Sequence, residues 1–375
     1  MRISLITDTY LPEVNGVTTV LATMRQGLRA RGHEVQVIAP AYDRPGPDDE
    51  GVIRRWSLRF PPYPQMRLSL PVGGDVRRAL TGFRPDIVHV ATEGPLGTLG
   101  RRAALASGIP LVTSFHTDFP RYAERYLGQW AVGPVQGYLR RFHAPAYLTQ
   151  TPSQTTRDEL AVLGFRRPVV WGRGVDTRLF HPAHRSVARR AALGVNDDTP
   201  IVLHVSRLAV EKDVGTLVAA FRAAHAELGD RARFIVAGDG PEGAMVRSAL
   251  PFATHYGFID RTRLAEVYAD SDLFIFPSPT ETCGLVVLEA MASGLPVITS
   301  DRGGVLENVR HALNGVMVPA GDHGAFTQAI VDLVELPRGR AAMASAARAF
   351  AVARDWDREL DQLEPMYRAA IDAAA

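Results

Sequence analysis

Two glutamates eight residues apart are the most informative feature of the sequence. Glu281 and Glu289 lie in the stretch Pro-Ser-Pro-Thr-Glu-Thr-Cys-Gly-Leu-Val-Val-Leu-Glu that begins at Pro277. An apolar run ends there in a proline-rich turn, and a helix is predicted to begin near Gly284 or Leu285. The amides of the first turn lie at the positive end of a helix dipole, where they suit a phosphate. These amides belong to Cys283, Gly284, Leu285 and Val286.

The two carboxylates suit the hydroxyl groups of a nucleotide sugar. Glu289 lies about one turn into the predicted helix, where it can accept hydrogen bonds from a ribose, and Glu281 can do the same for a sugar. The alternative interpretation is a solvated loop acid at Glu281 and a helix-surface acid at Glu289. Because Glu289 has Leu285, Leu288 and Met291 around it, the functional interpretation is favoured.

A second candidate site holds the single lysine of the chain. Of the 42 basic residues, 41 are arginine, and the exception is Lys212, five residues after Arg207. Arg207 follows an apolar run at its carboxyl end, where ligands of parallel sheets bind. Two cations there can neutralise a departing diphosphate, the task that Mg²⁺ performs elsewhere, so we expect no metal and no other cofactor. The alternative is an exposed face paired with Glu211 and Asp213.

Two motifs in the first half could complete such a site. Gly16 begins a helix after the loop Tyr10-Leu11-Pro12-Glu13-Val14-Asn15, and a glycine there lets backbone amides approach an anion. The alternative is an ordinary strand-to-helix turn, which would have a similar sequence. Asn15 precedes it, and we expect it to tolerate a left-handed conformation. His116 ends another apolar run, where it could contact a ligand or be satisfied by local hydrogen bonds. Asp118 could cap the helix that follows.

Alternation of short apolar runs with helical patterns predicts a parallel α/β protein. The strand candidates of the first half are 2–7, 34–39, 87–91, 111–115, 147–151 and 169–171, and those of the second are 201–206, 233–237, 254–257, 273–277, 297–300 and 315–319. The aperiodic segment 171–182 separates them as a linker would. We therefore expect two doubly wound Rossmann-like domains, 1–172 and 173–355, with a C-terminal helix, 356–375, that packs back on the first.

Length and composition agree with this division. A chain of 375 residues with 46% hydrophobic and 22% charged residues is globular and long enough for two domains. The single cysteine, Cys283, excludes an internal disulfide and a thiolate zinc cluster. No long apolar segment follows Met1, which predicts a soluble, cytoplasmic protein.

The charge distribution favours the first half as the side that meets an anionic surface or partner, although solubility alone could produce such a split. Residues 1–172 hold 21 arginines against 14 acidic residues, whereas residues 173–375 hold 21 basic residues against 26. Two segments interleave cations with aromatic residues: Arg54, Arg55, Trp56, Arg59, Phe60, Tyr63, Met66 and Arg67, then Arg121, Tyr122, Arg125, Tyr126, Trp130, Tyr138, Arg140, Arg141 and Phe142. They suit a peripheral contact with an anionic membrane, or an acceptor groove. The acidic second half argues against nucleic acid.

Taken together, these motifs resemble glycosyltransferase family 4. The frame Glu-x-x-Gly-Leu-x-x-x-Glu-Ala-Met-Ala is similar to its signature, and the segment from Val205 to Asp213 is similar to its diphosphate clamp. Further turns that match are Gly174-Val175-Asp176, Gly238-Asp239-Gly240-Pro241, Tyr256-Gly257-Phe258 and Ser300-Asp301-Arg302-Gly303-Gly304. The resemblance covers nearly the whole chain and implies the GT-B fold, in which two Rossmann-like domains face a cleft.

The resemblance implies a retaining enzyme that moves a hexose from a nucleoside-diphosphate sugar to an acceptor hydroxyl. It makes Arg207 and Lys212 the clamp of the leaving diphosphate, adds Tyr256 and Phe258 to the donor-binding residues, and gives His116 a contact with the sugar. The stretch 114–127 is most similar to the branch of GDP-mannose-dependent mannosyltransferases and glycolipid glycosyltransferases. We expect GDP-mannose and a lipid or glycan acceptor; the alternatives are a UDP-hexose donor and a sugar-nucleotide 2-epimerase.

Overall fold

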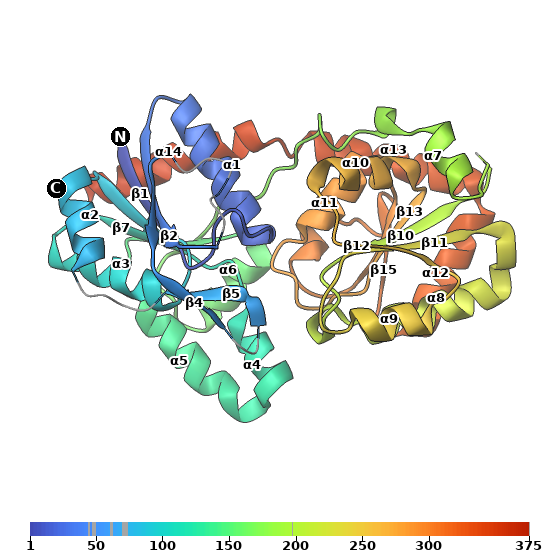
Figure 1. Ribbon diagram of the computed structural model, residues 1–375, viewed down its shortest axis with the longest axis horizontal. Coiled ribbons are helices and arrows are strands. Elements are labelled where there is room, and N and C mark those ends of the chain that lie inside the picture. The colour runs from blue at the N-terminus through green and yellow to red at the C-terminus, as the bar shows by residue number, and fades with distance from the viewer. Residues whose placement is uncertain (44–45, 47–49, 61–62, 70–73, 197, 375) are drawn as a thin grey trace. The chain divides into compact units, whose positions relative to one another are not determined.

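The chain contains two parallel β-sheets, each flanked by helices (Figure 1). The computed structural model describes residues 1–43, 46, 50–60, 63–69, 74–196 and 198–374. By its internal contacts the chain divides into unit 1, Met1–Gly172 with Trp356–Ala375, and unit 2, Arg173–Asp355. The prediction of two doubly wound Rossmann-like domains is confirmed, because each sheet is parallel and strands alternate with helices.

Unit 1 has a seven-stranded sheet in the order β3-β2-β1-β6-β7-β8-β9. Its strands are β1 (Arg2–Ile6), β2 (Glu34–Pro40), β3 (Val52–Arg55), β6 (Ile87–Val90), β7 (Leu111–Ser114), β8 (Thr149–Thr151) and β9 (Pro168–Val170). Its helices are α1 (Gly16–Ala30), α2 (Asp75–Phe83), α3 (Pro95–Ala106), α4 (Phe119–Leu127), α5 (Val132–His143), α6 (Gln154–Val162) and α14 (Trp356–Asp372). The strand order reverses at β1, which has β2 on one side and β6 on the other.

The segment of mixed cations and aromatics before α2 forms strands that sequence periodicity did not predict. Besides β3, it contains the antiparallel pair β4 (Ser57–Phe60) and β5 (Tyr63–Ser69). The side chains of Phe60, Tyr63 and Met66 lie outside the described part of the structure. Arginine and aromatic residues follow one another in this segment, so apolar and polar residues do not alternate with the period of two that identifies a strand.

Unit 2 has a six-stranded sheet in the order β12-β11-β10-β13-β14-β15. Its strands are β10 (Ile201–Val205), β11 (Arg233–Ala237), β12 (Thr254–Gly257), β13 (Leu273–Phe276), β14 (Val297–Ser300) and β15 (Gly315–Val318). Its α-helices are α7 (Val187–Ala192), α8 (Val214–Leu228), α9 (Gly243–Ala249), α10 (Arg261–Asp270), α11 (Leu285–Ala292), α12 (His323–Glu335) and α13 (Pro337–Val352). Here the order reverses between β10 and β13, which pair directly.

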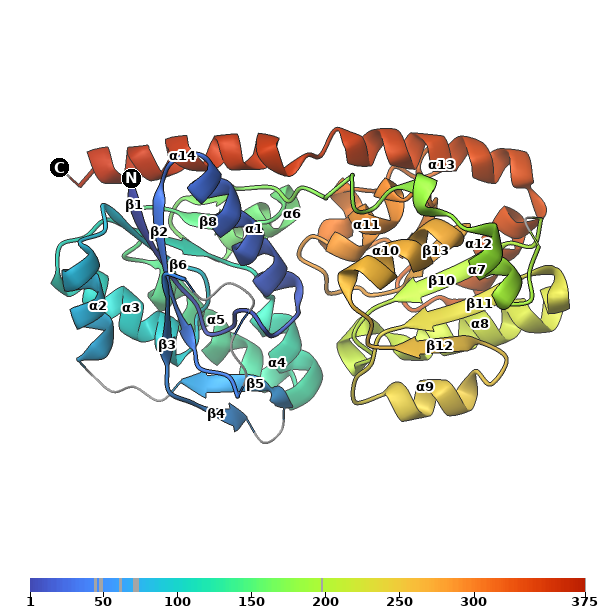
Figure 2. The ribbon, with the colours of Figure 1, turned by 45° about the horizontal axis from the view of Figure 1, so that its top comes forward.

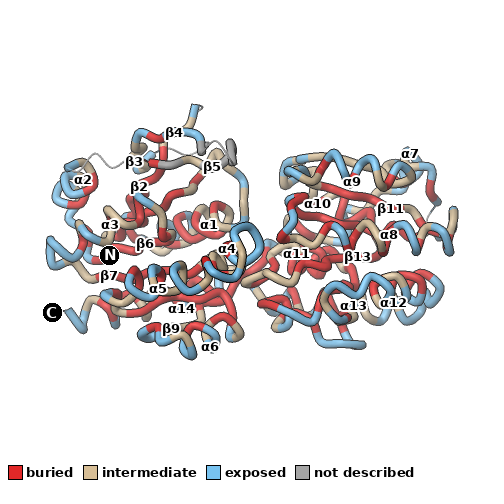
Figure 3. Tube along the Cα trace, turned by 90° about the horizontal axis from the view of Figure 1, so that it is seen from below, coloured by how far each residue is buried: buried red, intermediate tan, exposed pale blue. Residues whose placement is uncertain are grey.

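The strands read as continuous apolar runs because helices cover both faces of each sheet (Figure 3). Every residue of β10 and β13 is buried, and the residues of β13 are at most 1% exposed. His204 is the one polar residue in these two strands, and its ring bonds to the carbonyl of Ile275 and the hydroxyl of Ser206, so its burial is compensated.

The last helix, α14, returns to unit 1 and lies beside α1 (Figure 2). A side chain at Gly27 would place its Cβ 2.2 Å from Leu360, so glycine permits the close approach of the two helices. Tyr367 of α14 bonds to the buried His89 of β6, with 2.6 Å between the hydroxyl and Nδ1. No helix within the described ranges combines the length and apolar character needed to cross a membrane.

Candidate active site

The loops that follow β10 and β13 meet at the switch point of the unit 2 sheet. In open parallel sheets a ligand binds at the carboxyl ends of the two strands where the order reverses. Arg207 lies two residues beyond β10, and Glu281 lies five residues beyond β13. The fold therefore brings the two predicted clusters to one edge of one sheet, although 74 positions separate their numbers.

Arg207 is held by a buried carboxylate. Its guanidinium forms an ion pair with Glu211, whose side chain is fully buried while that of Arg207 is 40% exposed. The carbonyl of Glu211 also accepts hydrogen bonds from Thr280 (3.0 Å) and Ser278 (3.4 Å) of the loop after β13. The alternative interpretation from the sequence places Glu211 on an exposed charged face, which is wrong because its side chain is fully buried. Its burial shows instead that it joins the two loops.

Lys212 forms an ion pair with Glu281, and both side chains are largely buried, at 16% and 15% exposure. Ser278 donates a further hydrogen bond to the same carboxylate oxygen of Glu281, at 3.3 Å. The alternative of a solvated loop acid is therefore wrong for Glu281. Burial, with a smaller contribution from the charge of Lys212, lowers the pKa of the nearby His204 to about 4, so that this ring is neutral at physiological pH.

Asp213 gives the clamp segment its turn. The 3-10 helix η3 (Val210–Lys212) ends at Asp213, which has φ 52° and ψ 45°, and α8 begins at the next residue. Few residues other than glycine, asparagine and aspartate adopt this left-handed conformation without strain. The turn at Asp213 therefore separates η3, which ends at Lys212, from α8, which begins at Val214.

Glycine turns pack closely against the backbone of both loops. A Cβ at Gly238 would lie 1.8 Å from the carbonyl oxygen of Ser206, and one at Gly304 would lie 2.0 Å from that of Thr282. The amide of Leu208 donates to the carbonyl of Asp239 at 3.0 Å, and the amide of Gly304 donates to that of Glu281 at 2.6 Å. Backbone contacts this close explain why these turns contain glycine.

The helix after Glu281 begins as predicted. Gly284 precedes α11 in the left-handed conformation, with φ 75°, and no side chain caps the helix. Burial raises the pKa of the Cys283 thiol to about 11, so the thiol is neutral. The backbone carbonyl of Cys283 accepts a hydrogen bond from the side-chain amide of Asn308 at 2.8 Å. These contacts fix the loop that presents the amides of Gly284, Leu285 and Val286.

Glu289 is buried, not at the helix surface as the alternative interpretation required. It is 6% exposed, and Arg261 at the start of α10 pairs with it at 3.1 Å. Burial raises the pKa of Glu289 to about 7, and Arg261 opposes this rise. Sequence analysis did not identify Arg261, because nothing in the local pattern links residues 261 and 289.

Tyr256 and Phe258 lie at the end of β12 and directly after it. The guanidinium of Arg263 lies over the Tyr256 ring at 5.7 Å from its centroid. Phe258 follows a half-buried edge strand and is 67% exposed, a large exposure for an aromatic residue. An exposed ring at the carboxyl edge of the sheet is suited to stacking on a flat ligand group.

In unit 1, the loop before Gly16 is tied by polar contacts. Asn15 caps α1 by accepting from the amide of Thr18 at 2.9 Å, and its φ of −151° is extended. Asn15 therefore does not use the left-handed conformation that asparagine tolerates, because as the N-cap residue it takes the extended form. Glu13 accepts from Thr9, Asn15 and Tyr42, so a local network fixes the loop.

His116 lies two residues after β7 and is partly buried. Asp118 accepts a hydrogen bond from the amide of Arg121 at 3.1 Å and caps α4, as predicted. His116 and Gly16 belong to unit 1, whereas the paired charges described above belong to unit 2, and the functional roles of all these residues remain predictions.

Two Asp-x-Asp triplets in the sequence bear on the expected metal-free catalysis, because the carboxylates of such a triplet could hold a metal ion. In the first, Asp270 is paired with Arg189, and Asp272 with Arg185 and Arg190. In the second, Asp357 is paired with Arg31. Among the described residues, no group of three or more His, Cys, Asp or Glu side chains is arranged to hold a metal ion. Metal independence remains a prediction.

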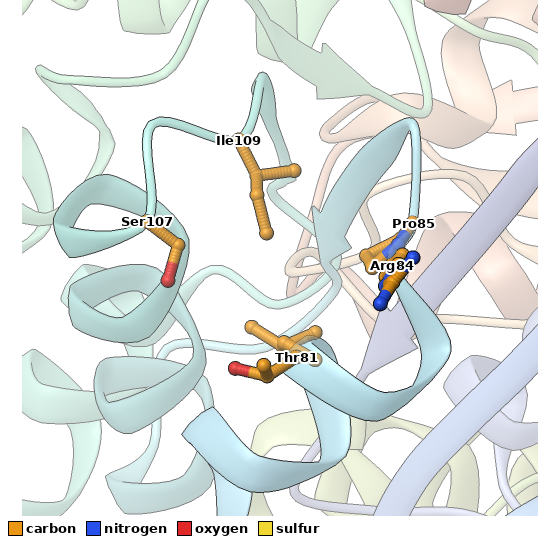
Figure 4. A pocket seen from close by; sticks show the side chains of 6 residues that line it. Thr81, Arg84, Pro85, Ser107 and Ile109 are labelled. Carbon is orange, nitrogen blue, oxygen red and sulfur yellow. The ribbon is translucent and has the colours of Figure 1, made fainter.

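Unit 1 contains a hollow of about 320 Å³ (Figure 4). It is lined by Leu80, Thr81, Arg84, Pro85, Ser107 and Ile109. Pro85 and Ile109 precede β6 and β7, so the hollow lies at the amino ends of the strands. Ligands of such sheets bind at the opposite edge, and we assign no role to this hollow.

Comparison with known proteins extends over both units. A family model described as Glycosyltransferase Family 4 matches residues 14–179, and one described as Glycosyl transferases group 1 matches residues 188–350. Over 378 residues the chain is 35% identical to a GDP-mannose-dependent alpha-mannosyltransferase of Mycobacterium tuberculosis (strain CDC 1551 / Oshkosh), covering 98% of this chain and 97% of that protein.

A second relative and a solved structure agree with these matches. Over 339 residues the chain is 30% identical to a GDP-mannose-dependent alpha-(1-6)-phosphatidylinositol dimannoside mannosyltransferase of Mycobacterium tuberculosis (strain ATCC 25177 / H37Ra), covering 84% of this chain and 88% of that protein. The fold matches that of sucrose-phosphate synthase from Thermosynechococcus elongatus, with a TM-score of 0.80 at 20% identity and 99% coverage of both chains. The chain therefore belongs to glycosyltransferase family 4 and is a hexosyltransferase of the GT-B fold.

Proposed function

We propose that this enzyme transfers mannose from GDP-mannose to a hydroxyl group of a lipid acceptor, with retention at the anomeric carbon. The observation that carries the proposal is the set of two cations and two carboxylates at the switch point of unit 2. The donor class is supported by the names of the two mannosyltransferases, which share 35% and 30% identity with this chain, and the acceptor class by the name of the second.

In this proposal the cations assist the departure of the nucleotide. Arg207 and Lys212 stabilise the negative charge that develops on the leaving diphosphate, and the amides of Gly284 to Val286 add hydrogen bonds. Because both cations already have carboxylate partners, the diphosphate must compete with Glu211 and Glu281 for them. The same ion pairs hold Arg207 and Lys212 in place before the donor binds.

The remaining donor contacts follow from the chemistry of each group. Glu281 is proposed to orient the hydroxyls of the sugar, Glu289 those of the ribose, and the rings of Tyr256 and Phe258 the base. His116 is proposed to contact the sugar, and amides near Gly16 the phosphate. The acceptor attacks on the face from which the nucleotide departs, so the reaction needs no protein nucleophile. No metal is required when the two cations neutralise the diphosphate.

A panel of nucleotides tests the donor assignment. At a concentration 100 times its Kd, GDP is expected to raise the midpoint of thermal unfolding by about 5 °C, because ligand binding at that excess adds about 2.7 kcal/mol. UDP and ADP at the same concentration should give smaller shifts. A larger shift with UDP would replace GDP-mannose by a UDP-hexose, and no shift with any of the three would refute the donor site.

Turnover assays with the corresponding sugar nucleotides then separate transfer from epimerisation. A transferase releases GDP only as fast as acceptor is glycosylated. Release of nucleotide and an epimerised sugar without acceptor would instead indicate a sugar-nucleotide 2-epimerase. The anomeric configuration of the product, determined by NMR, tests retention.

We further propose that unit 1 contacts an anionic membrane surface through α4 and the turn after it. Tyr126, Leu127 and Trp130 are 49%, 59% and 74% exposed, and the exposed Arg125 lies beside them. Exposed aromatic and aliphatic side chains with a neighbouring cation suit the headgroup region of a bilayer. Such a contact would bring the enzyme to a lipid acceptor.

Cosedimentation with vesicles tests this contact. The wild-type protein is expected to bind vesicles of anionic phosphatidylglycerol more strongly than vesicles of phosphatidylcholine. Replacing both Leu127 and Trp130 by serine should weaken binding at least ~10-fold, since each buried apolar side chain contributes about 1.5 to 3 kcal/mol. Val162→Ser, at a position 88% exposed on α6, is the matched control. Equal binding of all three proteins would refute the proposal.

A further inference from the structure

The pair formed by Glu289 and Arg261 connects two elements that sequence analysis treated separately. Arg261 is the first residue of α10, after β12, and Glu289 lies in α11, after β13. The guanidinium contacts Glu289 at 3.1 Å and lies over the ring of Phe180 at 5.1 Å from its centroid. With 38% exposure, the side chain of Arg261 reaches from the surface to a carboxylate that is only 8% exposed.

Among the described residues, no cation other than Arg261 forms an ion pair with Glu289. From α10, Tyr268 is also buried, and its hydroxyl donates to the carbonyl of Val286 at 3.2 Å. From α13, Arg348 donates to the carbonyls of Ala292 and Phe180. The strands β13 and β14 contain no titratable residue. The charge state of Glu289 thus depends mainly on burial, which favours the neutral acid, and on Arg261, which favours the carboxylate.

The charge state decides what Glu289 can bind. An ionised carboxylate only accepts hydrogen bonds and can take one from each of two adjacent hydroxyl groups. A protonated carboxyl group has a proton of its own to donate and loses acceptor strength. With a pKa of about 7, Glu289 is close to the point at which a small change in its surroundings alters its ionisation.

We infer that Arg261 is a positioning residue for the donor: it favours the ionised form of Glu289 and orients it to accept hydrogen bonds from the two ribose hydroxyls. The inference rests on the ribose role proposed for Glu289. It adds a residue from outside the Glu-x-x-Gly-Leu-x-x-x-Glu motif, and it makes donor affinity depend on pH. Loss of Arg261 raises the pKa of Glu289 further, so the ionised fraction at neutral pH falls and returns as the pH rises.

Calorimetric titration with GDP between pH 6 and pH 9 tests the inference. Arg261→Gln is expected to weaken GDP binding at least ~10-fold at pH 7, because hydrogen bonds to charged groups contribute about 1.5 to 3 kcal/mol. The loss should shrink toward pH 9. Arg261→Lys should restore most of the affinity at pH 7. Arg231→Gln, which breaks an exposed ion pair with Glu335 in the same unit, is the matched control.

A second measurement reads Glu289 without nucleotide. In protein with ¹³C-labelled glutamate, the carboxyl resonance of Glu289, assigned by its loss in Glu289→Gln, should titrate at higher pH in Arg261→Gln than in the wild type. An unchanged titration would overturn the inference, and so would an equal loss of GDP affinity at every pH, which indicates a purely structural role.

The Glu289→Gln variant separates this inference from the proposed function. If Glu289→Gln weakens GDP binding but Arg261→Gln does not, the inference is wrong and the ribose role stands. If Glu289→Gln binds GDP as the wild type does, the ribose role is wrong, and the donor role of Arg261 is overturned with it.

Discussion

Lys212→Ala is expected to lower kcat for sugar transfer by about 10² to 10³, the usual effect of removing one preoriented group that stabilises developing charge. The ammonium is largely buried, and Glu281 orients it. The variant removes a positive charge and also leaves Glu281 without this partner, so both the leaving diphosphate and the sugar lose a contact. Steady-state rates at saturating donor measure the effect, and a retained activity within about threefold of wild type would refute the clamp.

Two further variants show whether charge alone is sufficient at this position. Lys212→Arg keeps the charge but replaces a compact ammonium by a planar guanidinium. We expect only partial activity, because the larger guanidinium must fit where the largely buried ammonium now pairs with Glu281. Arg231→Ala, in an exposed ion pair of the same unit, should leave kcat unchanged. Unfolding curves for each variant establish that the protein is still folded.

Arg190→Met is expected to destabilise unit 2 by about 3 to 5 kcal/mol, the effect of removing one partner from a buried ion pair. The side chain of Arg190 is fully buried and pairs with Asp272 at 3.0 Å. It also donates to the carbonyls of Asn196, Thr199 and Asp270. These bonds join α7 to the segments before β10 and β13, so their loss leaves several polar groups buried without a partner.

The effect should be confined to unit 2 and can be located there. All four tryptophans, at positions 56, 130, 171 and 356, belong to unit 1, so their fluorescence does not report unit 2 directly. Hydrogen exchange should therefore accelerate in β10 and β13 of Arg190→Met while β1 and β6 keep their protection. Arg231→Ala, with 56% exposure, is the control and should cost less than about 1 kcal/mol. Unchanged exchange in β10 would contradict the prediction.

The elements of the fold could be predicted where the chain is buried on both sides. Continuous apolar runs such as 201–206 and 273–277 indicated parallel strands, and the residues after them were the correct place to look for polar groups. The segment 52–69 was missed because its strands carry arginine and aromatic residues without a clear period. The sequence also left the conformation of Asn15 open, and the structure shows that a capping hydrogen bond from Thr18 holds it extended.

The sequence by itself determined the chemistry that is available: one lysine five residues after Arg207, two glutamates eight residues apart, and glycines at the turns. Residue types and short spacings carry this information because helix starts and strand ends depend on neighbours along the chain. Only the tertiary structure decided which of these groups meet. Lys212 contacts Glu281, and Arg261 contacts Glu289, because β10 pairs with β13 and α10 lies beside α11. Strand order and helix packing depend on contacts distant in sequence, which no local pattern records.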